Sequence, residues 1–223
     1  HLNSQKNNIA FTIKKIKVKS NKFLFYHLPF SIIFFGLLYI IIPTFYTYNK
    51  TVIQKIICKS YNVECIIKGK LTYSFFPTPR LKIKDLIINI PSNNKEALLT
   101  INDATLKLSI KNLLAKDKHE IKKIFFSDFE SNINLKKLKD YNAIFKSKIS
   151  SVPIIFTKGR IILYEEKNYV ATISDVRLIA KFLKNSSKTR LEGKFLNDNI
   201  TINFSNKISD NKPKTNIEFK MKD

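Results

Sequence analysis

The longest uninterrupted apolar stretch lies near the start of the chain. Residues 23–49 contain no Asp, Glu, Lys or Arg, and Phe30–Ile42 is apolar on every side of a helix. A helix needs about 20 such residues to cross the hydrocarbon core of a bilayer, and a buried core helix would keep a polar stripe. A cleaved signal peptide would end in small residues, whereas Pro43–Tyr46 is bulky. Residues 23–49 are therefore predicted to form a transmembrane helix.

The apolar period changes after this segment. Val52, Ile53, Ile56 and Ile57 recur at helical spacing, which predicts a juxtamembrane amphipathic helix within residues 50–62. From residue 63 onward the period is two, as in half-buried strands. The predicted strands are 63–67, 71–75, 81–90, 99–110, 121–135, 152–156, 160–164, 169–179, 189–196 and 200–204. Lys68-Gly69 and 197–199 are predicted turns, 136–148 a helical insertion, and 205–223 an edge strand or frayed end. Residues 63–223 thus form one predicted β-rich domain.

Glycine and aspartate repeat at a fixed separation within this domain. Gly69 precedes Asp85 by the same interval by which Gly159 precedes Asp175, and a strand follows each glycine. Asp103 lies in the same local frame of apolar and polar neighbours. Such an aspartate can accept local backbone hydrogen bonds where a strand begins with a bulge and shifts its phase. A structural role is predicted for the residues of this motif, which are Gly69, Pro77, Pro79, Asp85, Asp103, Gly159 and Asp175.

The alternating apolar side chains are the candidate functional surface. They would line one face of the sheet, and the positions that define it are Leu71, Tyr73, Phe75, Leu106, Leu108, Ile110, Ile200, Ile202 and Phe204. Two architectures fit this pattern. The face can be sealed against a second sheet in a closed β-sandwich, or it can stay open as a groove on a curved sheet. Alternation alone favours the sandwich.

The charge of the chain changes this picture little. The sequence has 40 Lys and Arg against 17 Asp and Glu, a balance typical of nucleic-acid-binding proteins. The lysines, however, are scattered singly along the strands, so nucleic acid is not an expected partner. Part of the excess can favour anionic lipid headgroups. Residues 1–22 carry lysines and no acidic residue, which predicts a basic cytoplasmic tail and places the residues after the span outside the cytoplasm.

Candidate chemistry is sparse. Cys58 and Cys65 are the two cysteines, and they can either pair in an oxidising compartment or act as small apolar residues. The histidines are dispersed, and no nucleophile motif, phosphate loop or paired carboxylates occur. We expect no metal, no cofactor and no catalytic activity.

Several of these segments together resemble the amino-terminal part of the AsmA family of Gram-negative inner-membrane proteins. The resemblance includes the apolar span, the helix after it, Gly69–Leu86 (GKLTYSFFPTPRLKIKDL), Ala104–Leu114 and Gly159–Leu178, while Lys136–Ser151 departs from the family pattern. It implies a long, curved antiparallel sheet anchored in the inner membrane by one helix, with a lipid-sized apolar groove in the periplasm. With the resemblance, the groove is favoured over the sandwich.

The function implied by the resemblance is the conduction of phospholipid between membranes in support of outer-membrane assembly. Its implied partners are phospholipid, the inner membrane and other proteins of envelope or outer-membrane assembly. A non-catalytic scaffold or binding module of such an assembly is the alternative, because it requires only an exposed edge or patch.

Overall fold

The computed structural model describes residues 23–58, 63–90, 97–116, 118–138, 141, 152–183, 186–209 and 212–222. It divides the chain into two compact units, His1–Pro43 and Thr44–Asp223. The first contains a π-helical turn, η1 (Phe23–His27), and α2 (Leu28–Ile41), and η2 (Ile42–Phe45) follows. Phe25–Phe45 forms one helical stretch of 21 residues that is long and apolar enough to cross a membrane. The described helix is shorter than the predicted 23–49, because residues after Phe45 leave the helical conformation.

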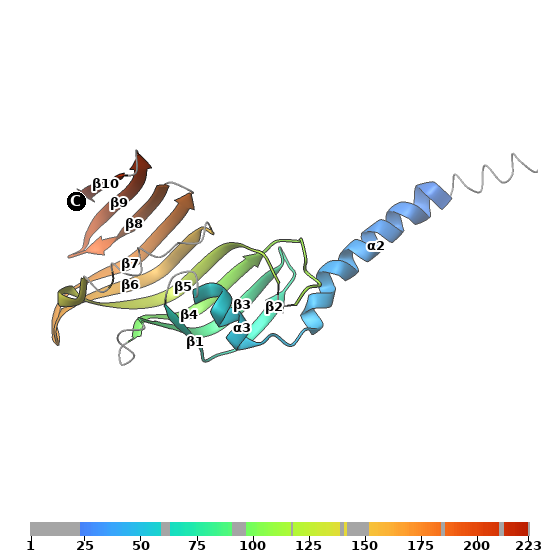
Figure 1. Cartoon of the computed structure of the whole chain (residues 1–223), viewed down its shortest axis with the longest axis horizontal. Coiled ribbons are helices and arrows are strands. Elements are labelled where there is room, and N and C mark those ends of the chain that lie inside the picture. The colour runs from blue at the N-terminus through green and yellow to red at the C-terminus, as the bar shows by residue number, and fades with distance from the viewer. Residues whose placement is uncertain are drawn as a thin grey trace, which may run out of the picture. The chain divides into compact units, whose positions relative to one another are not determined.

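The second unit consists of one short helix and a sheet. The helix α3 spans Lys50–Cys58, as its amphipathic spacing predicts. The strands are β1 (Glu64–Ile67), β2 (Leu71–Ser74), β3 (Arg80–Asn89), β4 (Ala97–Leu108), β5 (Ile121–Asn134), β6 (Ile154–Glu165), β7 (Asn168–Leu183), β8 (Ser186–Phe195), β9 (Asp198–Ser209) and β10 (Lys212–Lys222) (Figure 1). Every predicted strand is present, and the tail predicted as an edge strand or frayed end forms β10.

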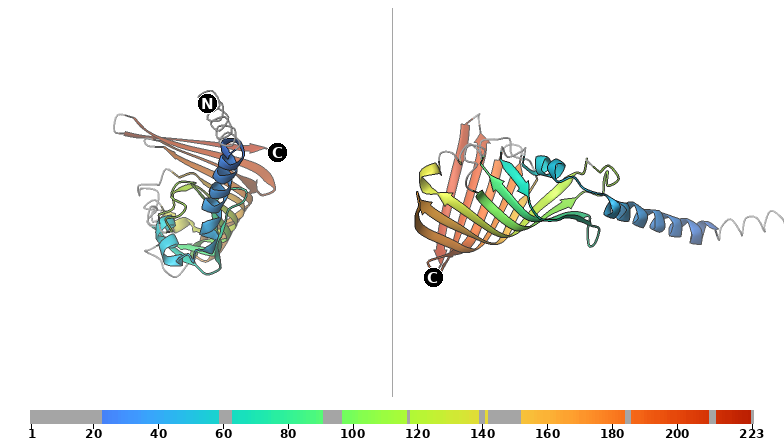
Figure 2. Two further views of the ribbon diagram at one scale, coloured as in Figure 1. Left: turned by 90° about the vertical axis from the view of Figure 1, so that its right-hand side faces the viewer. Right: turned by 90° about the horizontal axis from the view of Figure 1, so that it is seen from below.

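All ten strands belong to a single open, curved sheet (Figure 2). The order is β1-β3-β4-β5-β6-β7-β8-β9-β10, and β2 also pairs with β3. The predicted curved sheet is confirmed, and the described strands do not form the alternative closed sandwich. One feature differs from the expected antiparallel arrangement, because β5 and β6 run parallel. Parallel neighbours need a connection that returns the chain to the same end of the sheet, and residues 135–153 provide it.

A row of irregular residues crosses the sheet at mid-length. Asp85, Asp128, Lys158 and Asp175 have positive φ values of 53°, 55°, 55° and 50°. Asn102 of β4 is skipped in the pairing with both neighbouring strands, opposite Asp85 on one side and Asp128 on the other. Asp128 and Lys158 are likewise skipped together between β5 and β6. We call Asp85, Asn102, Asp128, Lys158 and Asp175 the irregular row, which has one residue in each of β3 to β7.

The irregular row explains the shifted apolar phase of the strands. Ile83 and Leu86 are both buried although they are three positions apart, and in a regular strand they would point to opposite faces. Their partners Ala104 and Ile101 are also three positions apart and also buried. A shift in one strand therefore requires a matching shift in its neighbour. Through this requirement the irregularity passes from strand to strand, and one apolar face continues on both sides of the row.

Glycines allow close approach beside the irregular row. A Cβ on Gly159 would lie 2.0 Å from Cε1 of Phe129, its partner on β5. A Cβ on Gly69 would lie 2.6 Å from a carboxylate oxygen of Asp85. The predicted turn at Lys68-Gly69 is wrong, because β1 and β2 follow one another along the same edge of β3. There the Lys68 and Gly69 amides donate to the carbonyls of Asp85 and Lys84 (2.9 and 3.1 Å), which keeps this edge continuous.

Other local expectations need smaller corrections. β6 is one strand where two were predicted, and the β8–β9 turn is Leu196-Asn197, one residue before the predicted start. Both turn residues have positive φ, as a two-residue hairpin of type I′ requires. The described part of the predicted helical insertion 136–148 contains the end of a 3-10 turn, η4 (Leu135–Lys137), and residues 138 and 141, which are both helical. The other residues of that insertion lie outside the described part of the chain.

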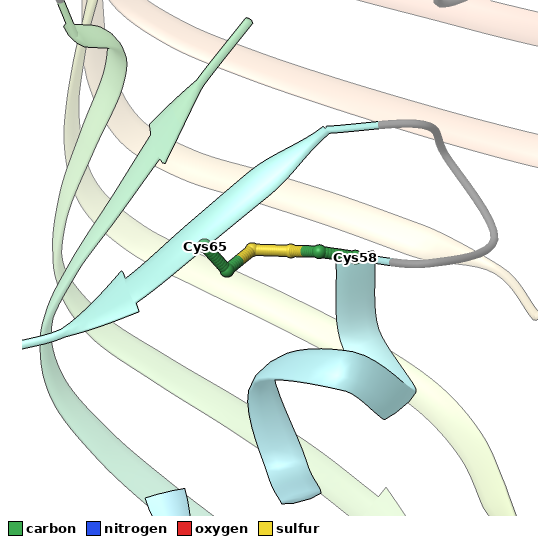
Figure 3. The surroundings of a disulfide bond; sticks show 2 residues. All are labelled: Cys58 and Cys65. Carbon is green, nitrogen blue, oxygen red and sulfur yellow. A yellow bond between two sulfur atoms is a disulfide. The ribbon is translucent and has the colours of Figure 1, made fainter. Parts of the chain in front are cut away.

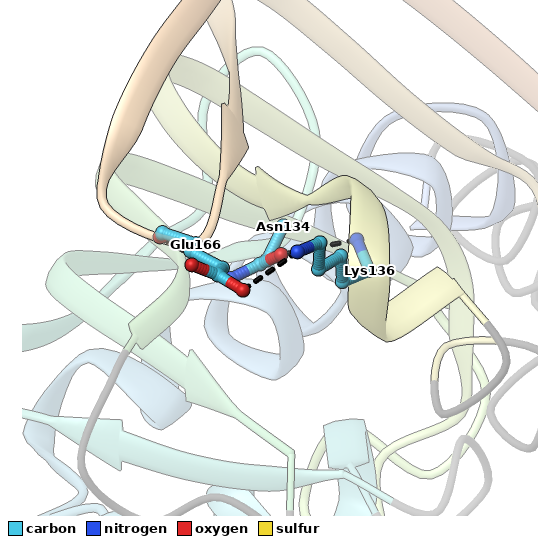
Figure 4. A network of polar contacts seen from close by, with 3 residues as sticks. All are labelled: Asn134, Lys136 and Glu166. Carbon is cyan, nitrogen blue, oxygen red and sulfur yellow. Dashed lines mark hydrogen bonds and ion pairs between the residues drawn. The ribbon is translucent and has the colours of Figure 1, made fainter.

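A polar network fixes the end of the parallel pair. Asn134 caps η4 by accepting a 3.1 Å hydrogen bond from the Lys136 amide. The Lys136 ammonium pairs with Glu166 at 2.6 Å, and the Asn134 amide donates to the Glu166 carbonyl (Figure 4). The end of β5 is thereby attached to the tip of the β6–β7 hairpin.

Candidate functional site

The candidate site is one face of the sheet. Residues paired directly across neighbouring strands share a face, so the register can be followed from strand to strand. Tyr73 pairs with Leu81, Leu81 with Leu106, Leu106 with Ile124 and Ile124 with Ile154. The same series continues through Ala180, Thr189 and Phe204 to Ile217 on β10. Its members are apolar except for Tyr73 and Thr189. We call this surface the apolar face.

The apolar face is sealed over the first strands. Leu81, Ile83, Leu86, Ile101 and Leu106 are each at most 1% exposed. Helix α3 lies beside β1 and buries Ile53, Ile57 and Cys58. Cys58 forms a disulfide with Cys65, whose partner Ile88 belongs to the apolar face (Figure 3). The helix is therefore held on the apolar side of the sheet, and of the two alternatives for the cysteines the structure has the paired one.

Aromatic side chains cover the first strands of the apolar face near residues 46–48, where the second unit begins. The Tyr48 ring lies 6.4 Å from that of Tyr73 at the end of β2 and 5.6 Å from that of His119. The Tyr48 hydroxyl is 3.2 Å from Nε2 of His119. Burial raises the pKa of the Tyr48 hydroxyl well above its usual range, with smaller contributions from Tyr73 and Tyr46. A neutral tyrosine thus covers the apolar face here.

The opposite end of the apolar face is open. Phe204 on β9 is 37% exposed, and on β10 Ile217, Phe219 and Met221 are 65%, 57% and 45% exposed. These residues belong to the same face, because Phe204 pairs with Ile217 and Ile202 with Phe219. Contiguous large apolar side chains at such exposure are unusual on the surface of a soluble monomer. The surface therefore changes gradually from a sealed core at β3 and β4 to an uncovered apolar strip at β9 and β10.

Most of the predicted groove residues lie on the apolar face. They are Leu71, Tyr73, Leu106, Leu108, Ile200, Ile202 and Phe204. Leu106 and Leu108 on β4 are buried, and so is Ile200 on β9, whereas Phe204, further along β9, is exposed. Phe75 and Ile110 lie outside the strands, in the loops after β2 and β4, and both are exposed. These two residues are not part of the face.

The residues of the predicted structural motif are distributed along the irregular row and one loop. Gly69, Asp85, Gly159 and Asp175 lie at or beside the row. Asp103 does not, because it is paired regularly and its carboxylate contacts the Lys84 ammonium, while its neighbour Asn102 is the skipped residue. Pro77 and Pro79 lie in the β2–β3 loop, where the Phe76-Pro77 bond is cis and the Pro79 carbonyl accepts from the Leu108 amide at 2.9 Å.

Three members of the irregular row were not predicted from the sequence, namely Asn102, Asp128 and Lys158. Asp128 and Lys158 lie between apolar residues three positions apart, Phe126 and Phe129 in one case and Phe156 and Gly159 in the other. Buried Phe126 and Phe129 flank Asp128 as Ile83 and Leu86 flank the row at Asp85, so the spacing was a usable signal in β5. Lys158 had no such signal, because glycine supplies no apolar side chain there.

The opposite face of the sheet is mixed, because Phe125, Ile155 and Ile179 pair across it, and it also contains cross-strand ion pairs. Arg160 pairs with Glu130, Arg177 with Glu192 at 3.6 Å, and Lys194 with Asp175 at 3.0 Å. Exposed pairs of this kind contribute little to stability, but they keep the outer face wet. Side chains with metal-ligand chemistry do not gather in threes within the described residues. The described sheet therefore has one face that can bind apolar groups and one that carries charged side chains in contact with water.

Comparison with known proteins identified no relative of this chain. No family model matches the chain, and the searches of curated proteins and of solved structures found no similar protein.

Proposed function

We propose that this chain is a non-catalytic, membrane-anchored protein that holds the acyl chains of phospholipids against its apolar face. The observation that carries the proposal is the exposed strip of Phe204, Ile217, Phe219 and Met221, which continues the sealed core without a break. Burying apolar surface of this kind is favourable by about 25 cal/mol per Å². An acyl chain offers such surface along a length that matches several strands.

The proposal includes a location. The apolar helix Phe25–Phe45 is the single-pass anchor, and the basic leader 1–22 favours a cytoplasmic amino terminus. The Cys58–Cys65 disulfide supports an oxidising compartment for the second unit, since disulfides persist there and are rare in the cytosol. We therefore place the sheet in the periplasm of a Gram-negative cell, in keeping with the resemblance to the AsmA family. Phospholipid transfer in support of outer-membrane assembly is the role that this placement and the resemblance favour.

The test is site-specific photo-crosslinking in cells. A photoreactive benzoylphenylalanine at position 219 faces the apolar side of β10, whereas the same residue at position 216 faces the other side. Both positions are exposed, so they form a matched pair. We expect crosslinked phospholipid at 219 and little at 216. Equal yields at the two positions would contradict the proposal.

A scaffold function is the second candidate. β10 is an edge strand whose outer backbone groups have no partner strand within the described chain. A protein that adds a strand there would cover the same apolar strip. Crosslinking of position 219 to a protein, without lipid, would favour this candidate.

A further inference from the structure

Four exposed apolar side chains gather at one end of the sheet, away from the open strip. Phe75 and Phe76 in the β2–β3 loop are 42% and 75% exposed, and Ile110 and Leu114 in the loop between β4 and β5 are 59% and 47% exposed. The two loops are adjacent, because the Leu108 amide donates to the Pro79 carbonyl. We call Phe75, Phe76, Ile110 and Leu114 the loop cluster. Neither the core nor the apolar face uses it.

The covalent chain ties the loop cluster to the end of the apolar helix. The segment capable of crossing a membrane ends at Phe45, and Tyr46 follows directly. The Tyr46 hydroxyl donates a 3.0 Å hydrogen bond to the Leu114 carbonyl. Tyr48, two residues further on, stacks on Tyr73 at the end of β2. If Phe45 is at the membrane boundary, the Leu114 carbonyl is within about one side-chain length of that boundary, and tyrosine is a residue that favours it. The β2–β3 loop begins two residues after Tyr73.

Basic residues surround the loop cluster. Lys111, Lys116 and Lys118 are exposed in the same loop as Ile110 and Leu114, and none forms an ion pair with a described acidic residue. Each lysine near an anionic membrane surface adds electrostatic attraction to that surface. Apolar side chains combined with lysines are the features by which peripheral segments bind the headgroup region.

We infer that the loop cluster is a second membrane contact, which inserts into the headgroup region of the bilayer that holds the anchor and prefers anionic lipid. This inference rests on the anchoring part of the proposed function and is independent of lipid binding by the apolar face. The contact fixes the sheet with its β2 and β4 ends at the bilayer surface. It gives exposed Phe75 and Ile110 apolar contacts at the boundary between headgroups and acyl chains, without assigning them to the groove.

The chain contains no tryptophan, so a single introduced one reports its own surroundings. We would reconstitute the full chain with Phe76→Trp into vesicles of phosphatidylcholine and phosphatidylglycerol that carry brominated acyl chains. The control is Tyr169→Trp, which is 63% exposed at the other end of the strands. Bromine quenching should be at least about twofold stronger at 76 than at 169. Equal quenching would overturn the inference.

Two further measurements separate the possible failures. Flotation of both variants with the vesicles reports the anchor, so loss of flotation would reject the anchoring proposal, whereas flotation without quenching at 76 would reject only the loop contact. Leu114→Trp provides a second probe position should Phe76→Trp fail to fold.

The contribution of the loop lysines is tested by a pair of charge-reversal variants. In the Phe76→Trp background, Lys111→Glu, Lys116→Glu and Lys118→Glu together should lower quenching in the anionic vesicles. The same three changes at exposed Lys167, Lys194 and Lys220, near the other end of the strands, should not. Equal losses in the two triple variants would contradict the preference of the loop for anionic lipid.

Discussion

At the scale of single residues, the unusual positions are the aspartates with positive φ. An L-residue in this conformation is strained by about 1–2 kcal/mol, and Asp and Asn tolerate it better than most. At Asp85 and at Asp175 the alternation of a strand shifts by one residue, so that apolar side chains on both sides of the irregular row point to the same face. Their backbone conformation, more than any carboxylate chemistry, is then the property that the fold requires.

This reading makes an ordered prediction for substitutions at Asp85. Asp85→Gly and Asp85→Asn should leave the free energy of unfolding near the wild-type value, because glycine and asparagine adopt positive φ readily. Asp85→Ala should lower it by about 1 kcal/mol. Chemical denaturation of the three variants measures the order. If Gly and Ala destabilise equally, the carboxylate and not the conformation is important.

Gly159 gives a second prediction at this scale. An alanine Cβ would overlap the Phe129 ring, which cannot move without disturbing its contact with Phe156, 5.1 Å away between ring centroids. Gly159→Ala should lower the free energy of unfolding by about 1–3 kcal/mol, as overpacking does. Gly36→Ala is the control, since no atom lies within 4 Å of its added Cβ. A neutral Gly159→Ala would mean that the ring has room to yield.

The sequence pattern predicted some of these irregular positions but not all of them. The aspartate frame around Asp85 and Asp175 was visible because apolar residues flank it at an odd spacing. The same frame indicated Asp103, but Asn102 takes the irregular position, since the skipped residue of β4 is set by its neighbours Asp85 and Asp128 and not by its own strand. Cross-strand partners of this kind cannot be read from one strand.

At the scale of elements, α3 depends on a covalent link. The Cys58–Cys65 bond closes a short loop between the helix and β1. By the chain-entropy model such a loop stabilises the fold by about 2–3 kcal/mol. A reducing agent should therefore lower the melting temperature of the wild-type protein and expose two thiols to alkylation. The double variant Cys58→Ser and Cys65→Ser should melt lower from the start and show no response to reductant, and a wild type without that response would contradict a structural role.

The alternation of apolar and polar residues predicted the strands, but it did not predict their relative directions. Period two reports which residues share a face, and it located every strand to within a few residues. It contains no information on whether neighbours run parallel or antiparallel, so the β5–β6 pair was missed. The open apolar strip was equally hidden, because Leu106 and Phe204 have the same pattern and differ only in what covers them.

At the scale of the whole molecule, the proposed topology makes a direct prediction. A reporter that is active only in the periplasm, fused after Asp223, should be active, and a reporter that requires the cytoplasm should be silent there. The physical reason is the retention of the basic leader on the cytoplasmic side. The same fusions to a variant with Lys14, Lys15, Lys17 and Lys19 changed to Glu provide a control that should weaken the orientation. The opposite reporter pattern in the wild type would reject the periplasmic placement of the sheet.

The parallel pairing of β5 and β6 has a consequence for how the molecule is built over time. Each other neighbouring pair in the sheet is antiparallel and close in sequence, either through a hairpin or, for β1 and β3, across β2, and such local contacts form quickly. β6 can join β5 only after the chain has travelled back along the length of the sheet, which is a slower closure. The seam between these two strands therefore divides the chain into an early block of β1 to β5 and a late block of β6 to β10. During synthesis the sealed core at β3 and β4 would exist before the exposed strip on β9 and β10 arrives.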